Sequence, residues 1–485
     1  MDPKTDSMIP DGTVSRSIEI GLRVIGVWPD SSYTVLRRAF WMITLAMAQT
    51  FQYRYFVIHV RTDDLSHLMD GLSTTMSYSL LLLKLTIFWI KRRIFYDILA
   101  MMARDRSECV SEWAVGLMSK TIDISHRSSN LIIGLYSMSV FLYGAGVLVA
   151  HPDEPEDQLT TMPPRELFLK MELPFESNAS PAYELVMITQ FFHQLAAATI
   201  VGVLNALIVS LILHVGGQID IMCRGLVEIS SGDDTFDLQT STIKALIRQH
   251  QRIIALSSDI ERVFSYIALM QFLWNTLVIC CLGFLIVTSI GSTQGSTTLI
   301  KSLFFYVVIT LEAFIFCYAG EYLSAKSRMI GDAAYEAKWY SSHPTQSRIL
   351  LLLILRSQRK LTITIGKFMD LSLERFTTVR CTFRTMFSFA VSDIGCTYFE
   401  RKYKYTLPIS NSTYELSRDN IFLQIEFMLN FFALLHPYIS FVDKSISHFS
   451  SCFIKYDKFY LLSSRLLRHQ GLMYPCCMLC PESRV

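Results

Sequence analysis

Seven long runs of apolar residues constrain this chain more than any other feature of its sequence. They cover about 38–60, 72–90, 129–150, 183–214, 266–290, 299–321 and 372–395. About 20 apolar residues in a helix cross the hydrocarbon core of a bilayer, and backbone groups in lipid must bond within their own segment. With 51% hydrophobic residues and a mean hydropathy of +0.34, the chain is too apolar for an ordinary soluble protein. We therefore predict an all-α, polytopic membrane protein with seven transmembrane helices.

The positive charges predict how these helices are oriented. Lys and Arg cluster before the first run and in the connections that follow the second, fourth and sixth runs. The alternate connections between runs hold only Arg61, Arg165 and Lys170, with Lys301 at the edge of the sixth run. Because cytosolic loops carry the excess of Lys and Arg, we predict a cytosolic amino terminus, the reverse of a G-protein-coupled receptor.

Composition divides the chain into three parts. The first 37 residues are polar and lack the apolar core of a cleavable signal peptide. We predict a cytosolic amino-terminal segment over 1–37, a seven-helix domain over 38–395 and a carboxyl-terminal extension over 396–485. Charged residues alternate with apolar ones at helical spacing over 243–260 and 321–338. The helix of the fifth run is therefore expected to begin in the cytosol, and the helix of the sixth run is expected to continue into it.

Four sequence fragments near the end of the helical domain carry a family resemblance. They are CYAGEYL at 317–323, YEAKWY at 335–340, LILRSQ at 353–358 and GKFMDLSL at 366–373. In this order and spacing they resemble the characteristic end of insect odorant receptors. The resemblance extends upstream over most of the chain, from about Ile18 to Val379.

The resemblance implies a function and an assembly. Insect odorant receptors bind small volatile, mostly apolar ligands among the outer halves of spans two, three, four and six. They form non-selective cation channels in the plasma membrane as hetero-tetramers with a shared co-receptor, and their cytosolic helix extensions form the anchor where subunits meet. The co-receptor carries a long insertion in the inner connection that is short here, at 216–264. The chain therefore resembles the ligand-tuned subunit, with membrane lipid as its surroundings and no nucleic-acid partner.

Aromatic, Met and Gln residues mark the candidate ligand pocket, because such pockets are apolar with a few polar groups. The candidates lie in the predicted outer halves of four spans and are Met76, Tyr78, Tyr136, Phe141, Tyr143, Met187, Gln190, Phe191, Phe304 and Tyr306. Residues of these types at helical spacing also serve as ordinary packing, so each candidate has that alternative.

Two charged residues lie inside predicted spans. Lys84 is about 12 residues into the second run, and Glu312 lies at a similar depth in the sixth. Charges at this depth are rare and are usually paired or functional. We predict that Lys84 and Glu312 form an intramembrane pair. The alternative is that Lys84 extends to the cytosolic interface by itself.

Other site types have weaker support in the sequence. Asn178 begins a glycosylation sequon in a predicted outer loop. His193 and His250 lack the convergent ligands that a metal site needs, and Cys476, Cys477 and Cys480 have no second ligand pair. With no phosphate loop or nucleophile motif, we predict no enzymatic activity, no cofactor and no metal.

Two further functions remain as alternatives. An insect gustatory receptor shares the architecture, but Thr397 and Tyr398 are followed by charged residues where that family has an apolar run. A secondary transporter would show paired halves or an inverted repeat, and the sequence has neither. The carboxyl end also departs from the resembling family, because Arg380 and Arg384 fall on one helical face of the seventh run. Pore residues are therefore not carried over beyond Val379.

Overall fold

A computed structural model describes residues 12–377, without 13, 30, 63–64, 110, 150–166, 176–178, 230–235, 290–295, 338, 342 and 375. The chain divides into two compact units, Met1–Thr397 and Tyr398–Val485, and all described residues belong to the first. The predicted extension 396–485 and almost all of the predicted seventh span lie outside the described residues.

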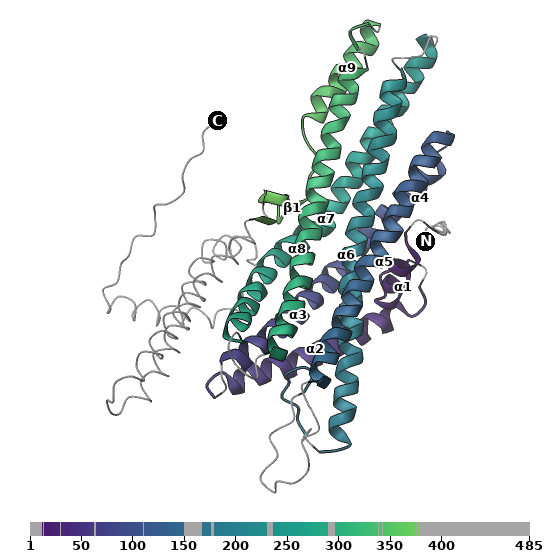
Figure 1. The fold of residues 1–485 in the computed structure, drawn as a ribbon. Coiled ribbons are helices and arrows are strands. Elements are labelled where there is room, and N and C mark those ends of the chain that lie inside the picture. Colours follow the sequence, from purple (N-terminus) through teal and green to yellow (C-terminus); the bar gives the residue numbers. More distant parts are fainter. Residues whose placement is uncertain are drawn as a thin grey trace, which may run out of the picture. The chain divides into compact units, whose positions relative to one another are not determined.

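The described part of the chain is almost entirely helical (Figure 1). Its elements, in chain order, are α1 Arg16–Val24, α2 Thr34–His59, α3 Leu65–Ile90, α4 Arg92–Ser107, α5 Glu112–Val149, α6 Ala182–Ile229, α7 Phe236–Ser289, α8 Ser296–Glu336, the 3-10 turn η1 Trp339–Ser341, α9 Pro344–Ser357, β1 Thr364–Ile365 and β2 Met369–Asp370. The predicted all-α fold is confirmed.

The first six predicted spans fall on α2, α3, α5, α6, α7 and α8. Among the described residues, four helices are both long and apolar enough to cross a membrane: Leu65–Ile90, Ala182–Glu228, Thr240–Ser289 and Thr298–Glu336. The helices α2 and α5 also have sufficient length, at 26 and 38 residues. The chain is therefore a multi-pass membrane protein by the length and composition of its helices.

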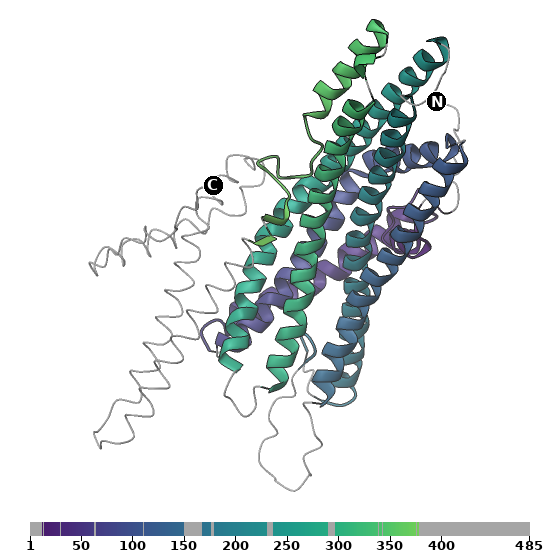
Figure 2. The ribbon, with the colours of Figure 1, turned by 45° about the horizontal axis from the view of Figure 1, so that its top comes forward.

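The long helices run beside one another in both ribbon views, with α2 oblique to them (Figures 1 and 2). Helix α6 has 48 residues and α7 has 54, so at 1.5 Å per residue each is roughly 70–80 Å long. A bilayer core of about 30 Å accounts for less than half of that length. The predicted helical extensions are confirmed: α7 runs without a break through 243–260, and α8 continues to Glu336.

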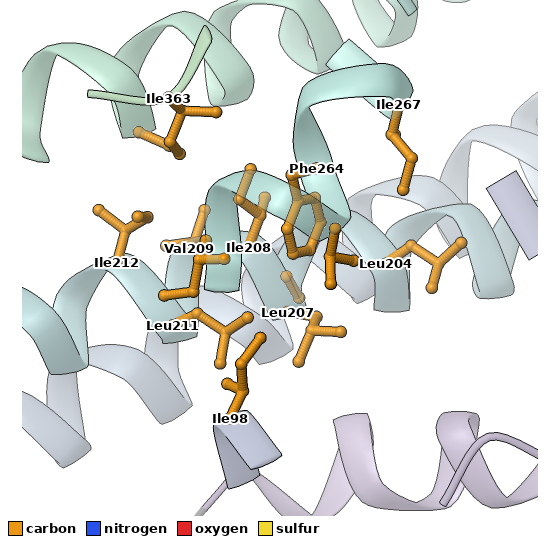
Figure 3. Close-up of a cluster of buried hydrophobic side chains, with 14 of the residues drawn as sticks. Ile98, Leu204, Leu207, Ile208, Val209, Leu211, Ile212, Phe264, Ile267 and Ile363 are labelled. Atoms are coloured by element: carbon orange, nitrogen blue, oxygen red, sulfur yellow. The ribbon is translucent and has the colours of Figure 1, made fainter. Parts of the chain in front are cut away.

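Helix α6 forms the centre of the packed core. Pro181 precedes it and no proline interrupts it, and every residue from 202 to 219 is buried. A helix that is apolar on all sides needs partners on all sides. Figure 3 shows those partners: α4 supplies Ile98, α7 supplies Phe264, and the segment after α9 supplies Ile363.

A short hairpin follows α9, which the all-helical prediction did not include. Gly366 and Lys367 both have positive φ, 58° and 67°, as a tight hairpin turn of the primed type requires. The N–H of Phe368 donates to the carbonyl of Ile365 across the turn, at 3.0 Å. The Gly366 N–H donates to the carbonyl of Ser265, also at 3.0 Å, so the turn is fixed to α7.

Candidate ligand-binding site

A cavity of about 110 Å³ lies among five helices. It is lined by 74–84 of α3, 136–143 of α5, 194–201 of α6, 274–278 of α7 and 304–312 of α8, together with Leu169. A single ordered water needs about 10–15 Å³ on the same scale, so the cavity has room for a small organic molecule. It lies in the first half of α6 and α8 and toward the end of α5 and α7, which is the side predicted to face outward.

The walls of the cavity are mostly apolar. Each of the five helices contributes at least one aliphatic side chain to the lining, and aromatic rings complete it. Tyr143 forms one wall: its ring meets Phe168 edge to face, with centroids 5.1 Å apart, and the ammonium of Lys301 lies 5.5 Å from its centroid. Apolar walls with a few polar groups are typical of sites for small molecules.

The structure places half of the predicted ligand residues at this cavity. Met76, Tyr78, Tyr136, Tyr143 and Phe304 line it. Phe141, Met187, Gln190, Phe191 and Tyr306 are not among its lining residues.

Three of those that do not line the cavity contact the segment that contributes Leu169 to its wall. The side-chain amide of Gln190 accepts from the N–H of Leu169 at 3.0 Å and donates to its carbonyl at 3.3 Å. Phe191 meets Phe168 edge to face, with centroids 5.9 Å apart. The N–H of Phe168 lies 3.1 Å from the sulfur of Met187. These contacts position Leu169 in the cavity wall.

The predicted intramembrane pair forms the polar end of the cavity. The ammonium of Lys84 donates to Oε1 of Glu312 at 2.5 Å, and the two side chains are 2% and 3% exposed. Asn205 connects the pair to the cavity wall, because its Nδ2 donates to Glu312 at 3.3 Å and to the hydroxyl of Tyr136 at 2.8 Å. The alternative, in which Lys84 reaches the interface by itself, does not fit this geometry. Each charge instead offsets the desolvation of the other.

A second polar contact joins two of the helices at the cavity. The hydroxyl of Tyr78 and Nδ1 of His193 are 3.1 Å apart, and the two rings stack with centroids 5.6 Å apart. This places His193 in a packing role that fits its lack of metal-type neighbours. Among the residues that the structure describes, no group of three or more His, Cys, Asp or Glu side chains is arranged to hold a metal ion.

The polar cavity residues that sequence reasoning missed include Gln194, Trp274 and Asn275. Trp274 and Asn275 lie on α7, which was not expected to contribute to the pocket. The available signal was their position: an amide and an indole stand side by side inside an apolar run, where polar groups are costly. The sequon residue Asn178 lies outside the described residues.

Comparisons with known proteins show what the sequence is similar to. The sequence profile of the 7tm odorant receptor family matches residues 64–383. Odorant receptor 82a of Drosophila melanogaster is 22% identical over 317 residues, which are 63% of this chain and 79% of that protein. Odorant receptor 10 of Aedes albopictus is 28% identical over 199 residues, 41% of this chain and about half (52%) of that protein.

A solved structure shares the fold. The insect olfactory receptor OR5 from Machilis hrabei, in complex with eugenol, superposes with a TM-score of 0.63 at 14% identity. The superposition covers 77% of this chain and 96% of that receptor. At this level of identity the likeness concerns the fold alone.

Proposed function

This chain belongs to the family of 7tm odorant receptors, and we propose that it binds small, volatile, mostly apolar molecules in the cavity between α3, α5, α6, α7 and α8. Binding there opens a non-selective cation channel that the chain forms with a co-receptor. The observation that carries the proposal is the cavity itself, with apolar walls, a wall residue, Leu169, held by Gln190, and the ion pair of Lys84 and Glu312 in its lining.

The depth of the cavity supports binding of an apolar ligand. Its lining residues start about ten residues into α3 and end near residue 143 of α5, so the site is within the apolar part of the helices. A volatile, mostly apolar molecule reaches such a site from water or lipid at little desolvation cost. Among the similar proteins, the solved insect receptor is a complex with eugenol, which supports small organic ligands as a class.

The co-receptor and the plasma membrane enter the proposal through family membership. The helices α6, α7 and α8 extend far beyond the thickness of a bilayer, and such extensions offer a cytosolic surface on which subunits assemble. The amino terminus is cytosolic in this proposal, because the Lys and Arg residues cluster in the connections on its side. A tag at the amino terminus should be stained only after permeabilisation, and staining of intact cells would contradict this orientation.

The decisive experiment records currents from cells that express the chain with and without the family's co-receptor, against a panel of volatile compounds. Ligand-evoked cation current should require both proteins. Surface labelling of each protein separates a failure of gating from a failure of the protein to reach the cell surface. Solute uptake without any ligand-gated current would instead favour a transporter.

A further inference from the structure

Three residues that line the cavity each carry a buried polar atom with no hydrogen-bond partner among the described residues. The atoms are Oε1 of Gln194 on α6 and, on α7, Nε1 of Trp274 and Nδ2 of Asn275. Asn275 is only 2% exposed. Buried polar atoms nearly always have a partner, so three of them at one cavity call for an explanation.

Two of the three atoms are donors, and their chemistry indicates which group of a ligand fits beside them. The indole N–H of Trp274 and the amide nitrogen of Asn275 donate only, and they are neighbours in the chain that line the same cavity. An oxygen of a bound molecule is the natural acceptor for such donors. A hydrocarbon that displaced water from the cavity would instead leave both donors unpaired, which lowers affinity.

The charged residues at the cavity narrow the class further. The ammonium of Lys84 is already paired with Glu312, so it is not a free cation for an acidic ligand. A ligand carboxylate would also bring a second negative charge close to Glu312 and would have to lose its hydration. Neutral oxygen compounds meet neither obstacle.

We propose, resting on the function proposed above for this cavity, that it selects neutral ligands with a hydrogen-bond-accepting oxygen on an apolar body. Ketones, aldehydes and esters belong to this class. Trp274 and Asn275 on α7 hold the oxygen, and the apolar walls hold the rest of the molecule. Pure hydrocarbons and carboxylic acids of the same size bind less well.

The test compares molecules of one shape that differ in the oxygen. Acetophenone is paired with α-methylstyrene, and methyl ketones of graded chain length are paired with the alkenes in which a methylene group replaces the carbonyl oxygen. Currents are recorded from cells that express the chain with the co-receptor, and thermal unfolding of the purified chain is followed with each compound. The ketones should act at about tenfold lower concentration than their alkene partners, the effect of one buried hydrogen bond.

Variants assign the effect to the two donors. Asn275→Leu and Trp274→Phe should each reduce the ketone preference severalfold. Trp274→Phe keeps an aromatic ring in place, so it still tests the proposal if Asn275→Leu fails to reach the cell surface. Gln271→Leu is the matched control. Gln271 is a buried amide one helical turn from Asn275 whose side-chain atoms also have no partner among the described residues, but it does not line the cavity. This control should keep the full preference.

The outcomes separate this inference from the function on which it rests. Equal potency of ketones and alkenes, or an unchanged preference in Trp274→Phe, overturns the inference and leaves the receptor function intact. Greater thermal stabilisation by ketones without any current supports the chemistry of the cavity and contradicts the channel. If no compound produces a current or a thermal shift, both proposals are wrong.

Discussion

The two halves of α6 have similar apolar sequences but different surroundings. From 202 to 219 every residue is buried, and the side chains of α4 and α7 fill the space around them (Figure 3). From 182 to 201 only Gln190, Ala197 and Ile200 are buried, and this half lines the cavity. The packed half fixes the arrangement of the helices, whereas the open half leaves space whose shape and polarity side chains can change.

The difference separates residues that maintain the fold from residues that select a ligand. A close-packed interior responds to the loss of even one methylene group. A smaller side chain in a cavity wall removes contacts with the ligand but few contacts within the protein. Changes in the packed half should therefore lower the stability of the protein and affect the response to all ligands alike. Changes in the open half should affect the response to one ligand more than to another.

The largest effect is expected near the boundary between the halves of α6. There Asn205 of α6 donates to Glu312, which is paired with Lys84. Lys84→Met or Glu312→Leu leaves one charge buried without its partner, at a cost of about 3–5 kcal/mol. Each single variant should show much lower surface expression and thermal stability. The double variant should recover a large part of that loss, because it leaves no unpaired charge. If the double variant is no better than the worse single one, the pair does not interact.

Beside the packed half of α6, the change Phe264→Ala on α7 should destabilise the protein without altering ligand preference. Phe264 is 1% exposed and meets Phe88 edge to face, with ring centroids 5.6 Å apart. Removing a buried phenylalanine costs about 3–5 kcal/mol. Thermal unfolding of the purified chain measures the loss, and the rank order of ligands by current should be unchanged. Leu185→Ala, at an exposed position of α6, is the control and should be nearly neutral.

At the cavity beside the open half of α6, the change Tyr143→Ala on α5 should alter which odorants activate the complex. Tyr143 lines the cavity, and losing one aromatic wall costs about 1–3 kcal/mol for ligands that touch it and little for others. Phe141 lies two residues away on α5, is 49% exposed and does not line the cavity, so Phe141→Ala serves as the control. Concentration–response curves for a ligand panel measure both. A uniform shift for all ligands would show that Tyr143 acts through packing.

The sequence predicts the helices well because lipid leaves few alternatives for an apolar run. It also predicts the partnership of Lys84 and Glu312, since two charges at equal depth stabilise each other. It does not tell which apolar residues line a cavity and which fill the core, because an aromatic side chain satisfies either environment. Phe191 illustrates this: it looks like a ligand contact, but it does not line the cavity and its ring packs edge to face against Phe168.

The smallest expected effect lies far from the cavity, in the hairpin after α9. The ammonium of Lys360 donates to the carboxylate of Asp370 at 2.8 Å, and the hydroxyl of Thr362 donates to it at 3.1 Å. The hydrogen bond from Lys360 is the main cause that holds the pKa of Asp370 below its ordinary value of 3.8. Because this pKa is lower in the folded state, the ion pair stabilises the hairpin above pH 3.8, and the contribution is lost as the pH falls through the folded pKa.

Asp370→Asn should therefore loosen the hairpin at neutral pH and have no effect in strong acid. Both side chains are about two-fifths exposed, so solvent screening limits the contribution to at most about 1 kcal/mol. Hydrogen exchange of the amides over 361–371 measures it, and exchange at neutral pH should be up to several times faster in the variant. In a Lys360→Met background, Asp370→Asn should add little, because the main partner is already gone. An equal effect of Asp370→Asn in both backgrounds would assign the low pKa to Thr362 and the turn rather than to Lys360.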